Sequence, residues 1–323
     1  MRSIIVPRTG GPEVYAIEDT ERPLPGSGQV AVDLSVSGVN YLDATQRKGA
    51  TPLAPPFAAG VEGAGTITRI GEGVEGFAIG QRVGWLAGGQ GSFSDAVAVE
   101  ADKLVALPDD IDDETAVAAL MQGITAHYLT TDTYPIKQGD RVLVHAAAGG
   151  LGQLLVQLAA QTGATVYGTV STAEKAGIAR SRGAEQVLGY GDFADRIHEL
   201  TGGEGVGVVY DGIGADTFEG SLAALGIRGM LVCLGNASGP TPPLDIASLN
   251  SGGSLYVTRP TVAHHIRTPG ELRRRAEDVF GWIRAGRLSV SIGQRYPVEQ
   301  VATAFRELES RRTVGKTLLL HHP

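Results

Sequence analysis

The fold is decided by residues 141–158, which read RVLVHAAAGGLGQLLVQL. An apolar, β-branched run enters a turn of small residues, and the turn opens a stretch with apolar residues at helical spacing. Ala147, Gly149 and Gly152 stand at the three small positions of a dinucleotide-binding fingerprint, with alanine at the first. Small residues are needed because the turn is sharp, a pyrophosphate approaches the backbone, and the helix lies close on the strand. The stretch therefore predicts a pyrophosphate bound at the N-terminus of a helix.

This pattern is weak by itself in a chain with 46 glycines, and a tight turn without a ligand is the alternative. The sequence that follows favours the binding site, because strand and helix patterns alternate. Strands are expected at 141–145, 165–170, 186–190, 207–211, 229–234 and 254–257, with helices at 151–162, 172–182, 193–200 and 216–225. This alternation predicts an α/β fold with a parallel sheet and helices on both faces.

The residues before this region are mostly β. Short apolar runs at 29–34, 65–70, 82–86 and 96–99, cut by glycine and proline, predict a compact barrel or sandwich. A helix is expected at 113–128, and the tail is expected to form a helix at 271–285, a strand at 290–292, a helix at 298–310 and a strand at 316–320. The tail is too short to fold alone. We therefore expect one domain from residues 1–122 and 266–323, and a second from residues 123–265.

The end of the second strand of the alternating region indicates which dinucleotide is bound. A site that prefers NAD places a carboxylate there for the ribose 2′-hydroxyl. This chain instead has Ser171, followed by Thr172 and, one helical turn on, Lys175. Hydroxyls and an ammonium suit a 2′-phosphate, so we expect NADPH. Glu174 is the counter-argument, and a helix cap beside a solvated lysine is the alternative interpretation.

Composition excludes several classes of protein. The chain has 323 residues, 42% of them hydrophobic, and a formal net charge of −8, which disfavours nucleic acid as a partner. It has one cysteine, Cys233, so neither an intramolecular disulfide nor a multi-cysteine zinc site can form. The opening residues lack the apolar stretch of a signal peptide, and no run is long enough for a membrane span. We expect a soluble, cytoplasmic protein with no membrane association and no metal.

Several motifs are shared in order with one known family. They include GGPEV at 10–14, PLPGSGQV at 23–30, GVNYLD at 38–43, GVEGAG at 60–65, VVYDGIG at 208–214, LGNASG at 234–239, SLYVTRP at 254–260 and GKT at 315–317. With these motifs the chain resembles the zinc-free quinone oxidoreductase branch (zeta-crystallin-like) of the medium-chain dehydrogenase/reductase superfamily. Zinc-dependent relatives carry a cysteine ligand near Asn40 and a four-cysteine lobe, which this chain lacks.

The resemblance implies a GroES-like β-barrel catalytic domain, a doubly wound Rossmann domain for NADPH, and a homodimer. It places Asn40 and Thr125 near the nicotinamide and the 148–152 turn on the pyrophosphate. Carried over residue by residue, the implied cofactor contacts are Asn40, Thr125, Ala148, Gly149, Gly150, Leu151, Gly152, Ser171, Lys175, Tyr190, Leu234, Gly235, Asn236, Tyr256, Val257, Thr258 and Lys316. Some relatives have tyrosines near positions 45 and 51, where this chain has Thr45 and Thr51. The substrate side is therefore expected to be more polar.

The activity implied is reduction of quinones by NADPH without zinc. Hydroxyl or amide donors are expected to stabilise the developing negative charge, and Asn40 and Thr51 are the candidates on the substrate side. One alternative is an NADPH-dependent reductase of the C=C bond in alkenals or enones. The alternative from another class is a non-enzymatic NADPH-binding sensor or structural protein. The expected partner is thus a small quinone or another conjugated carbonyl compound.

Overall fold

The computed structural model describes residues 1–321; residues 322 and 323, the end of the expected first domain, lie outside the described part. The chain divides into two compact units. Unit 1 contains Met1–Ile124, His265–Trp282 and the residues from Val290 onward, and unit 2 contains Thr125–His264 and Ile283–Ser289.

Unit 2 is built on a six-stranded sheet in the order β11-β10-β9-β12-β13-β14. Every strand pair in this sheet is parallel. The strands are β9 (Arg141–Val144), β10 (Thr165–Thr169), β11 (Gln186–Leu188), β12 (Val206–Asp211), β13 (Leu225–Cys233) and β14 (Tyr256–Thr258). Numbered from β9, this is the 3-2-1-4-5-6 order of a doubly wound dinucleotide-binding fold, so the expected fold class is confirmed.

The helices of unit 2 follow the strands as expected. They are α3 (Gly150–Gln161), α4 (Ala173–Ser181), α5 (Phe193–Leu200), α6 (Phe218–Ala223) and α7 (Ile246–Ser251). The sequence did not indicate α7, which is six residues long and has no buried residue to give an apolar period. The core beneath these helices includes Leu143, Val209 and Leu231 of the central strands, all fully buried.

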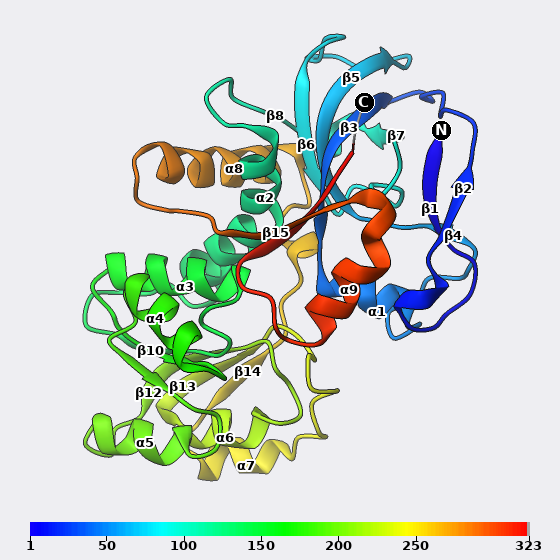
Figure 1. Ribbon diagram of the computed structural model, residues 1–323. Helices are drawn as coiled ribbons and strands as arrows, with labels where there is room; N and C mark the ends of the chain where they lie inside the picture. The colour runs from blue at the N-terminus through cyan, green and yellow to red at the C-terminus, as the bar shows by residue number, and fades with distance from the viewer. Residues whose placement is uncertain (322–323) are drawn as a thin grey trace. The chain divides into compact units, whose positions relative to one another are not determined.

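Unit 1 is mostly β. Its larger sheet joins β15 (Ile292–Pro297), β16 (Lys316–Leu320), β3 (Gln29–Val39), β5 (Glu62–Ile70), β6 (Arg82–Leu86) and β8 (Leu104–Ala106), with β7 (Ala96–Glu100) paired to β3. A three-stranded sheet contains β1 (Arg2–Val6), β2 (Ala16–Asp19) and β4 (Phe57–Ala58). The helices are α1 (Tyr41–Arg47), α2 (Asp113–Tyr128, which continues into unit 2), α8 (Pro269–Arg284, which also does) and α9 (Val301–Glu309). In Figure 1 the blue N-terminal strands and the red C-terminal strand both lie in this unit.

The C-terminal strand completes the larger sheet. β16 pairs antiparallel with β3, with Leu318 opposite Gly38, and parallel with β15. The strand expected at 290–292 is instead β15, which begins at Ile292. Its half-exposed, polar sequence has no apolar alternation that would mark it. The tail as a whole was expected with the first domain, but Ile283–Ser289 belongs to unit 2. There, Gln157 donates to the carbonyl of Ser289 at 3.1 Å.

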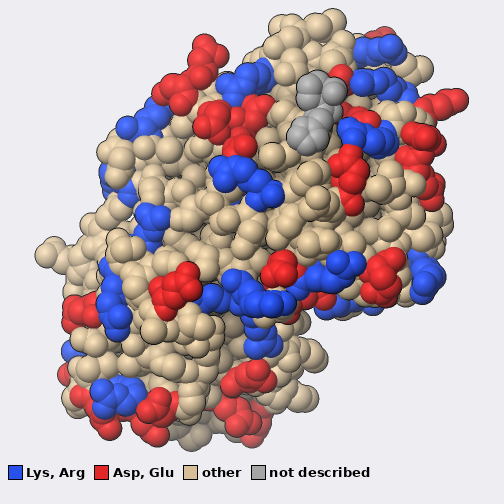
Figure 2. Space-filling view, in the orientation of Figure 1, with Lys and Arg blue, Asp and Glu red and all other residues tan. Residues whose placement is uncertain are grey.

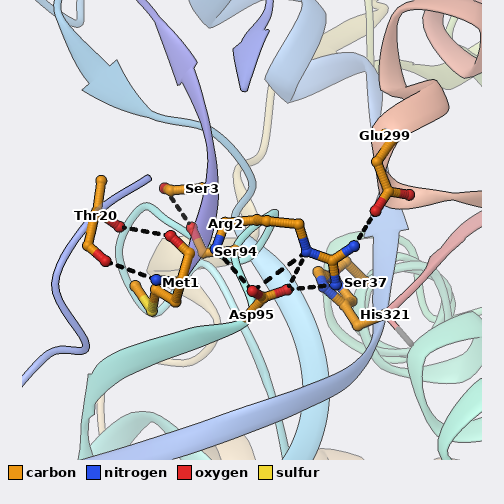
Figure 3. A network of polar contacts seen from close by, with 9 residues as sticks. All are labelled: Met1, Arg2, Ser3, Thr20, Ser37, Ser94, Asp95, Glu299 and His321. Carbon is orange, nitrogen blue, oxygen red and sulfur yellow. Dashed lines mark hydrogen bonds and ion pairs between the residues drawn. The ribbon is translucent and has the colours of Figure 1, made fainter. Parts of the chain in front are cut away.

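The first strand of the chain is held by charged side chains (Figure 3). The backbone N–H of Arg2 donates to Asp95 Oδ2 at 2.7 Å, and its guanidinium forms an ion pair with the same carboxylate at 2.8 Å and another with Glu299. In the same view, His321 Nε2 lies 2.8 Å from the hydroxyl of Ser37. These contacts fasten both ends of the described chain to the β-rich unit.

Figure 2 shows Lys and Arg interspersed with Asp and Glu on the face in view, without an extended area of one sign. The expectation that nucleic acid is no partner stays a prediction. Among residues 1–321, no helix is long and apolar enough to cross a membrane.

Candidate functional site

The fingerprint turn lies at the carboxyl end of β9, the central strand of the parallel sheet. Ala147 N–H donates to the carbonyl of Thr169 at 3.1 Å, and Gly149 N–H donates to the carbonyl of Ala146 at 2.8 Å. The turn then opens α3, whose N-cap is Gly149 and whose first turn has no acidic residue. Free N–H groups and the positive end of the helix dipole therefore meet whatever lies beyond Gly149.

Close approach explains the small residues. A Cβ on Gly152 would lie 2.3 Å from the carbonyl oxygen of Ala146, which no real contact allows. A Cβ on Gly168, in the neighbouring strand, would lie 2.8 Å from the Cβ of Ala147. Ala146 itself has a φ of 50°, a left-handed conformation that non-glycine residues adopt only in tight turns. The sequence is therefore constrained here by the backbone geometry of the turn.

A buried polar network links the same edge of the sheet across β9, β10 and β12. His145 Nδ1 lies 2.7 Å from Thr169 Oγ1, and its Nε2 lies 2.9 Å from Ser221 Oγ. Ser221 donates in turn to Asp211 Oδ2 at 2.8 Å. Because the Ser221 proton goes to the carboxylate, its oxygen accepts from His145 Nε2–H, and Nδ1 accepts from Thr169. Burial lowers the pKa of His145 to about 4, in agreement with a neutral imidazole. His145 is thus a buried histidine whose two ring nitrogens are both hydrogen-bonded.

Asp211 is the anchor of that network. Its Oδ1 accepts from the backbone N–H groups of Ile213 and Gly214 at 2.8 and 3.1 Å, and Thr217 donates to both oxygens. β9 and β12 are the two strands at which the strand order of the sheet reverses. Ligands of open α/β sheets bind outside the carboxyl ends of the strands at this switch point. The network thus makes rigid the edge that the fingerprint turn occupies.

The residues expected around an adenosine phosphate follow adjacent strands. Ser171 follows β10 and is exposed, Lys175 lies half-buried in the first turn of α4, and Tyr190 follows β11. The Tyr190 ring lies 6.2 Å from that of His145, so it reaches the same edge. Thr172 is the N-cap of α4 and accepts from the backbone N–H of Lys175 at 3.2 Å. Glu174 is exposed, as expected for a carboxylate turned to solvent.

The remaining candidates of unit 2 follow β13, form β14 or lie on α2. Leu234 N–H donates to the carbonyl of Asp211 at 2.6 Å, which holds Leu234 and Gly235 against the end of β12. Asn236 is exposed and its Oδ1 accepts from Arg259 at 3.1 Å. Tyr256, Val257 and Thr258 form β14, the edge strand. Thr125 is half-buried on α2. Their roles stay predictions.

In unit 1, Asn40 and Lys316 meet at the end of β3. Asn40 is the N-cap of α1, and Lys316 begins β16, which pairs with β3. Lys316 Nζ donates to Asn40 Oδ1 at 2.8 Å and to Glu62 Oε2 at 2.5 Å. The sequence indicated Asn40 and Lys316 separately but not Glu62, because nothing in a strand motif shows which partner, 254 residues away, a carboxylate will find.

Asp43 is a second buried carboxyl beside this group. Its Oδ2 accepts from the backbone N–H of Asn40 at 2.9 Å, which caps α1. Burial raises the pKa of Asp43 to about 7; the nearby Glu62 also raises it, whereas the Asn40 N–H and Lys316 lower it. The sequence signal for Asp43 was its place three residues after a helix cap.

The hydroxyl of Thr51 is already engaged. It lies 2.8 Å from Thr45 Oγ1, which itself donates to the carbonyl of Leu42 at 2.9 Å. Thr51 therefore donates to Thr45 in this arrangement, and has only lone pairs left for another group. Thr45 and Thr51 thus form a hydrogen-bonded pair.

Two family models match the chain. Residues 26–109 match the alcohol dehydrogenase GroES-like domain, and residues 150–277 match the model described as zinc-binding dehydrogenase. Among residues 1–321, no group of three or more His, Cys, Asp or Glu side chains could hold a metal ion.

Full-length relatives are also found. A quinone oxidoreductase of Pseudomonas aeruginosa is 42% identical over 96% of this chain and 97% of its own length. A 2-haloacrylate reductase of a Burkholderia species is 39% identical over 98% of both chains. The crystal structure of Escherichia coli quinone oxidoreductase complexed with NADPH has a TM-score of 0.96 at 38% identity, covering 99% of this chain and all of that one.

Proposed function

Because this chain belongs to the quinone oxidoreductase family of medium-chain dehydrogenases/reductases, we propose that it reduces quinones with NADPH. Two features of one sheet edge carry the proposal. The fingerprint turn opens α3 at the switch point of the sheet, and Ser171 and Lys175 follow the end of the neighbouring β10. The first feature suits a pyrophosphate and the second a 2′-phosphate.

The residues of unit 2 fit NADPH. The turn leaves no room for a Cβ at Gly152, so the helix lies as close to the strand as the fingerprint requires. When bound, NADPH supplies the hydride, while the protein supplies position and electrostatics. Ala148 to Gly152 hold the pyrophosphate, and Ser171, Lys175 and Tyr190 bind the phosphorylated ribose. Leu234, Gly235 and Asn236, with Tyr256, Val257 and Thr258, line the strand ends beyond it.

The residues of unit 1 supply polar groups for the nicotinamide, which is the reacting end of NADPH. Thr125 of unit 2 is assigned to the nicotinamide as well. Both N–H groups of the Asn40 amide are donated within the protein, to Glu62 Oε2 at 3.0 Å and to the carbonyl of Gly38 at 3.2 Å. The Asn40 amide therefore has no N–H left for the donor role expected from the sequence, and its oxygen accepts from Lys316 and from the backbone N–H of Asp43. Lys316 is the charged donor of this group. The Thr51 hydroxyl can donate to a substrate only if its hydrogen bond to Thr45 is broken.

A screen of NADPH oxidation tests the function. We expect the enzyme to oxidise NADPH with 1,4-benzoquinone and with 9,10-phenanthrenequinone as acceptors. This activity should remain after gel filtration of the enzyme. Gly150→Asp is the matched variant, because it puts a carboxylate where the pyrophosphate lies. It should fold and lose NADPH binding, whereas Gly177→Asp, at a helix position where a Cβ meets nothing within 4 Å, should keep both. NADPH binding without turnover on any acceptor would instead favour a non-enzymatic sensor or structural protein.

Reduction of an activated C=C bond is the second candidate. It is favoured by the similarity to the 2-haloacrylate reductase, which is almost as strong as that to the quinone oxidoreductases. The more polar Thr45–Thr51 pair also suits a small acid or enone. Rates with 2-chloroacrylate and 2-hexenal, measured beside the two quinones, decide between the candidates. A kcat/KM for either alkene above that for both quinones would reverse the assignment.

We also propose a homodimer formed through unit 2. β14 is a sheet edge, and Tyr256, on that strand, is 56% exposed. Ile227 of β13 and Ile246 of α7 are more exposed still, at 82% and 78%. Unpaired strand edges with exposed apolar side chains are suited to pairing with a second chain. Light scattering that gives the monomer mass at micromolar concentration would exclude it. The cytoplasmic location stays a prediction for cell fractionation to test.

A further inference from the structure

Glu62 is a buried carboxylate whose two oxygens are both used. The side chain of Glu62 is fully buried and Lys316 is 1% exposed. Oε1 accepts from the backbone N–H of Met121 at 2.8 Å. Oε2 accepts from Lys316 Nζ at 2.5 Å and from Asn40 Nδ2 at 3.0 Å. The carboxylate therefore ties α2, β16 and the N-cap of α1 to β5 at one point.

These contacts determine the orientation of the Asn40 amide. An ammonium only donates and a carboxylate only accepts, so the amide oxygen must face Lys316 and the amide nitrogen must face Glu62. With Gly38 accepting the second N–H, the nitrogen has nothing left to donate. The amide oxygen accepts from Lys316 and, in the capping box of α1, from the backbone N–H of Asp43, so both of its lone pairs are used. Among residues 1–321, Lys316 has two hydrogen-bond acceptors for its side chain, which leaves one N–H to donate.

We propose that Glu62 is a positioning residue, which fixes the Asn40 amide and holds Lys316 so that its remaining N–H is a donor toward the bound ligand. The inference rests on the proposed function, which places Asn40 and Lys316 at the cofactor. A ligand group that meets this N–H must offer an acceptor, as a ribose hydroxyl or the oxygen of a primary carboxamide does.

The backbone of β3 is shaped to admit this arrangement. A Cβ on Gly38 would lie 2.1 Å from Glu62 Oε2 and 2.9 Å from Lys316 Cε. Only glycine leaves room for the two charged side chains against the strand. The Glu62–Lys316 ion pair is thus accommodated by Gly38, which stands two residues before Asn40 in the same motif.

Glutamine cannot replace Glu62 in this role. If its amide oxygen faces Met121 N–H, its NH₂ meets the Lys316 ammonium and the Asn40 NH₂, which are all donors. If the amide is reversed, its NH₂ meets the Met121 N–H. Glu62→Gln therefore loses either the bond from Met121 or the bonds from Lys316 and Asn40, whichever way its amide is turned. It also leaves the buried Lys316 without a counter-ion.

The first readout is the Asn40 side chain itself, and it needs no cofactor. The chain has three asparagines, of which Asn236 and Asn250 are exposed. In protein labelled with ¹⁵N-asparagine, we expect the Nδ2 protons of Asn40 to exchange slowly and those of the other two to exchange fast. In Glu62→Gln the slow pair should become at least tenfold faster. An unchanged slow pair in the folded variant would overturn the proposal.

The second readout is binding of NADPH, measured by fluorescence titration. We expect Glu62→Gln to raise the dissociation constant by about tenfold or more, the size of a lost bond to a charged group. Asp95→Asn is the control, because it breaks a partly buried ion pair in the same unit without touching Asn40 or Lys316. It should leave affinity unchanged, and equal weakening in both variants would reduce Glu62 to a structural role.

The remaining outcomes are also decisive. If Glu62→Gln does not fold, Glu62→Asp keeps the charge but withdraws it by one methylene, and the same two readouts apply to it. If wild type neither binds NADPH nor reduces any acceptor, the proposed function fails while the exchange result still decides what Glu62 does to Asn40.

Discussion

Asp211 and His145, on the neighbouring strand ends of β12 and β9, are joined by a single hydroxyl, that of Ser221. All three side chains are buried, and Ser221 is fully so. The hydroxyl accepts from the imidazole and donates to the carboxylate, so it links the two strand ends. Since His145 is also the first residue of the fingerprint turn, the geometry of the cofactor site depends on a serine from α6.

Ser221→Ala should therefore destabilise unit 2 and loosen the turn. Leaving His145 Nε2 without its partner should cost about 1–3 kcal/mol of unfolding free energy. We expect NADPH affinity to fall as well, because the turn is less well held. Urea unfolding and cofactor titration measure the two effects. Ser181→Ala, which removes an exposed hydroxyl from α4, is the control and should change neither; equal effects from both variants would contradict this role.

Asp43 should give stability an unusual pH dependence. Burial raises its pKa to about 7 in the folded protein, against about 3.9 in an unfolded chain. The stabilising contribution of its proton is complete below the unfolded value and is lost as the pH rises through about 7. Relative to wild type, Asp43→Asn should thus gain unfolding free energy between pH 4 and 7, by about 1.4 kcal/mol per pKa unit.

Chemical denaturation of both proteins at several pH values measures that difference. Taking the difference between the two unfolding free energies cancels the contributions of the other titrating groups. A loss of the helix cap that does not depend on pH shifts this difference by a constant. A difference that stays flat from pH 4 to 7 would show that Asp43 is ionised throughout and that the Asn40 N–H and Lys316 outweigh its burial.

Metal is the point on which composition and the family description differ. The matched model is described as zinc-binding, yet the chain has one cysteine, which is buried. A catalytic zinc needs about three protein ligands. We expect less than one zinc in ten chains by elemental analysis, and full quinone reduction after dialysis against a chelator. One zinc per chain, with activity lost on its removal and restored on its return, would overturn the zinc-free assignment.

What the sequence predicted well was local. The fingerprint turn is specified by adjacent small residues whose spacing reflects the backbone itself, and β16 is specified by an apolar run with a glycine before it. β15 was misplaced because none of its residues is fully buried and it carries Gln294 and Arg295, so its sequence lacks the apolar alternation that marks a strand.

What the sequence could not show were partners chosen by the folded chain. Ser221 looks like any helix serine until α6 brings it between His145 and Asp211. Glu62 belongs to a recognisable motif, but its charge is balanced by a lysine from the last strand. Such pairings depend on strand order, which no local period encodes, and it is these pairings that orient Asn40 and the turn.

The choice of cofactor provides the sharpest quantitative test. Lys175 lies in the first turn of α4, behind the end of β10, where the 2′-phosphate is expected. Lys175→Ala removes a charge-assisted contact that NADH cannot make. Such contacts contribute about 1.5–3 kcal/mol, so NADPH affinity should fall roughly 10- to 150-fold. The affinity for NADH should hardly change. The loss of NADPH affinity should shrink with added salt, which screens a half-exposed pair.

Titrating both cofactors into wild type and variant at two ionic strengths decides the matter. Equal weakening of both would make Lys175 structural, and a wild type that prefers NADH would contradict the reading of Ser171 and Lys175 as a phosphate site.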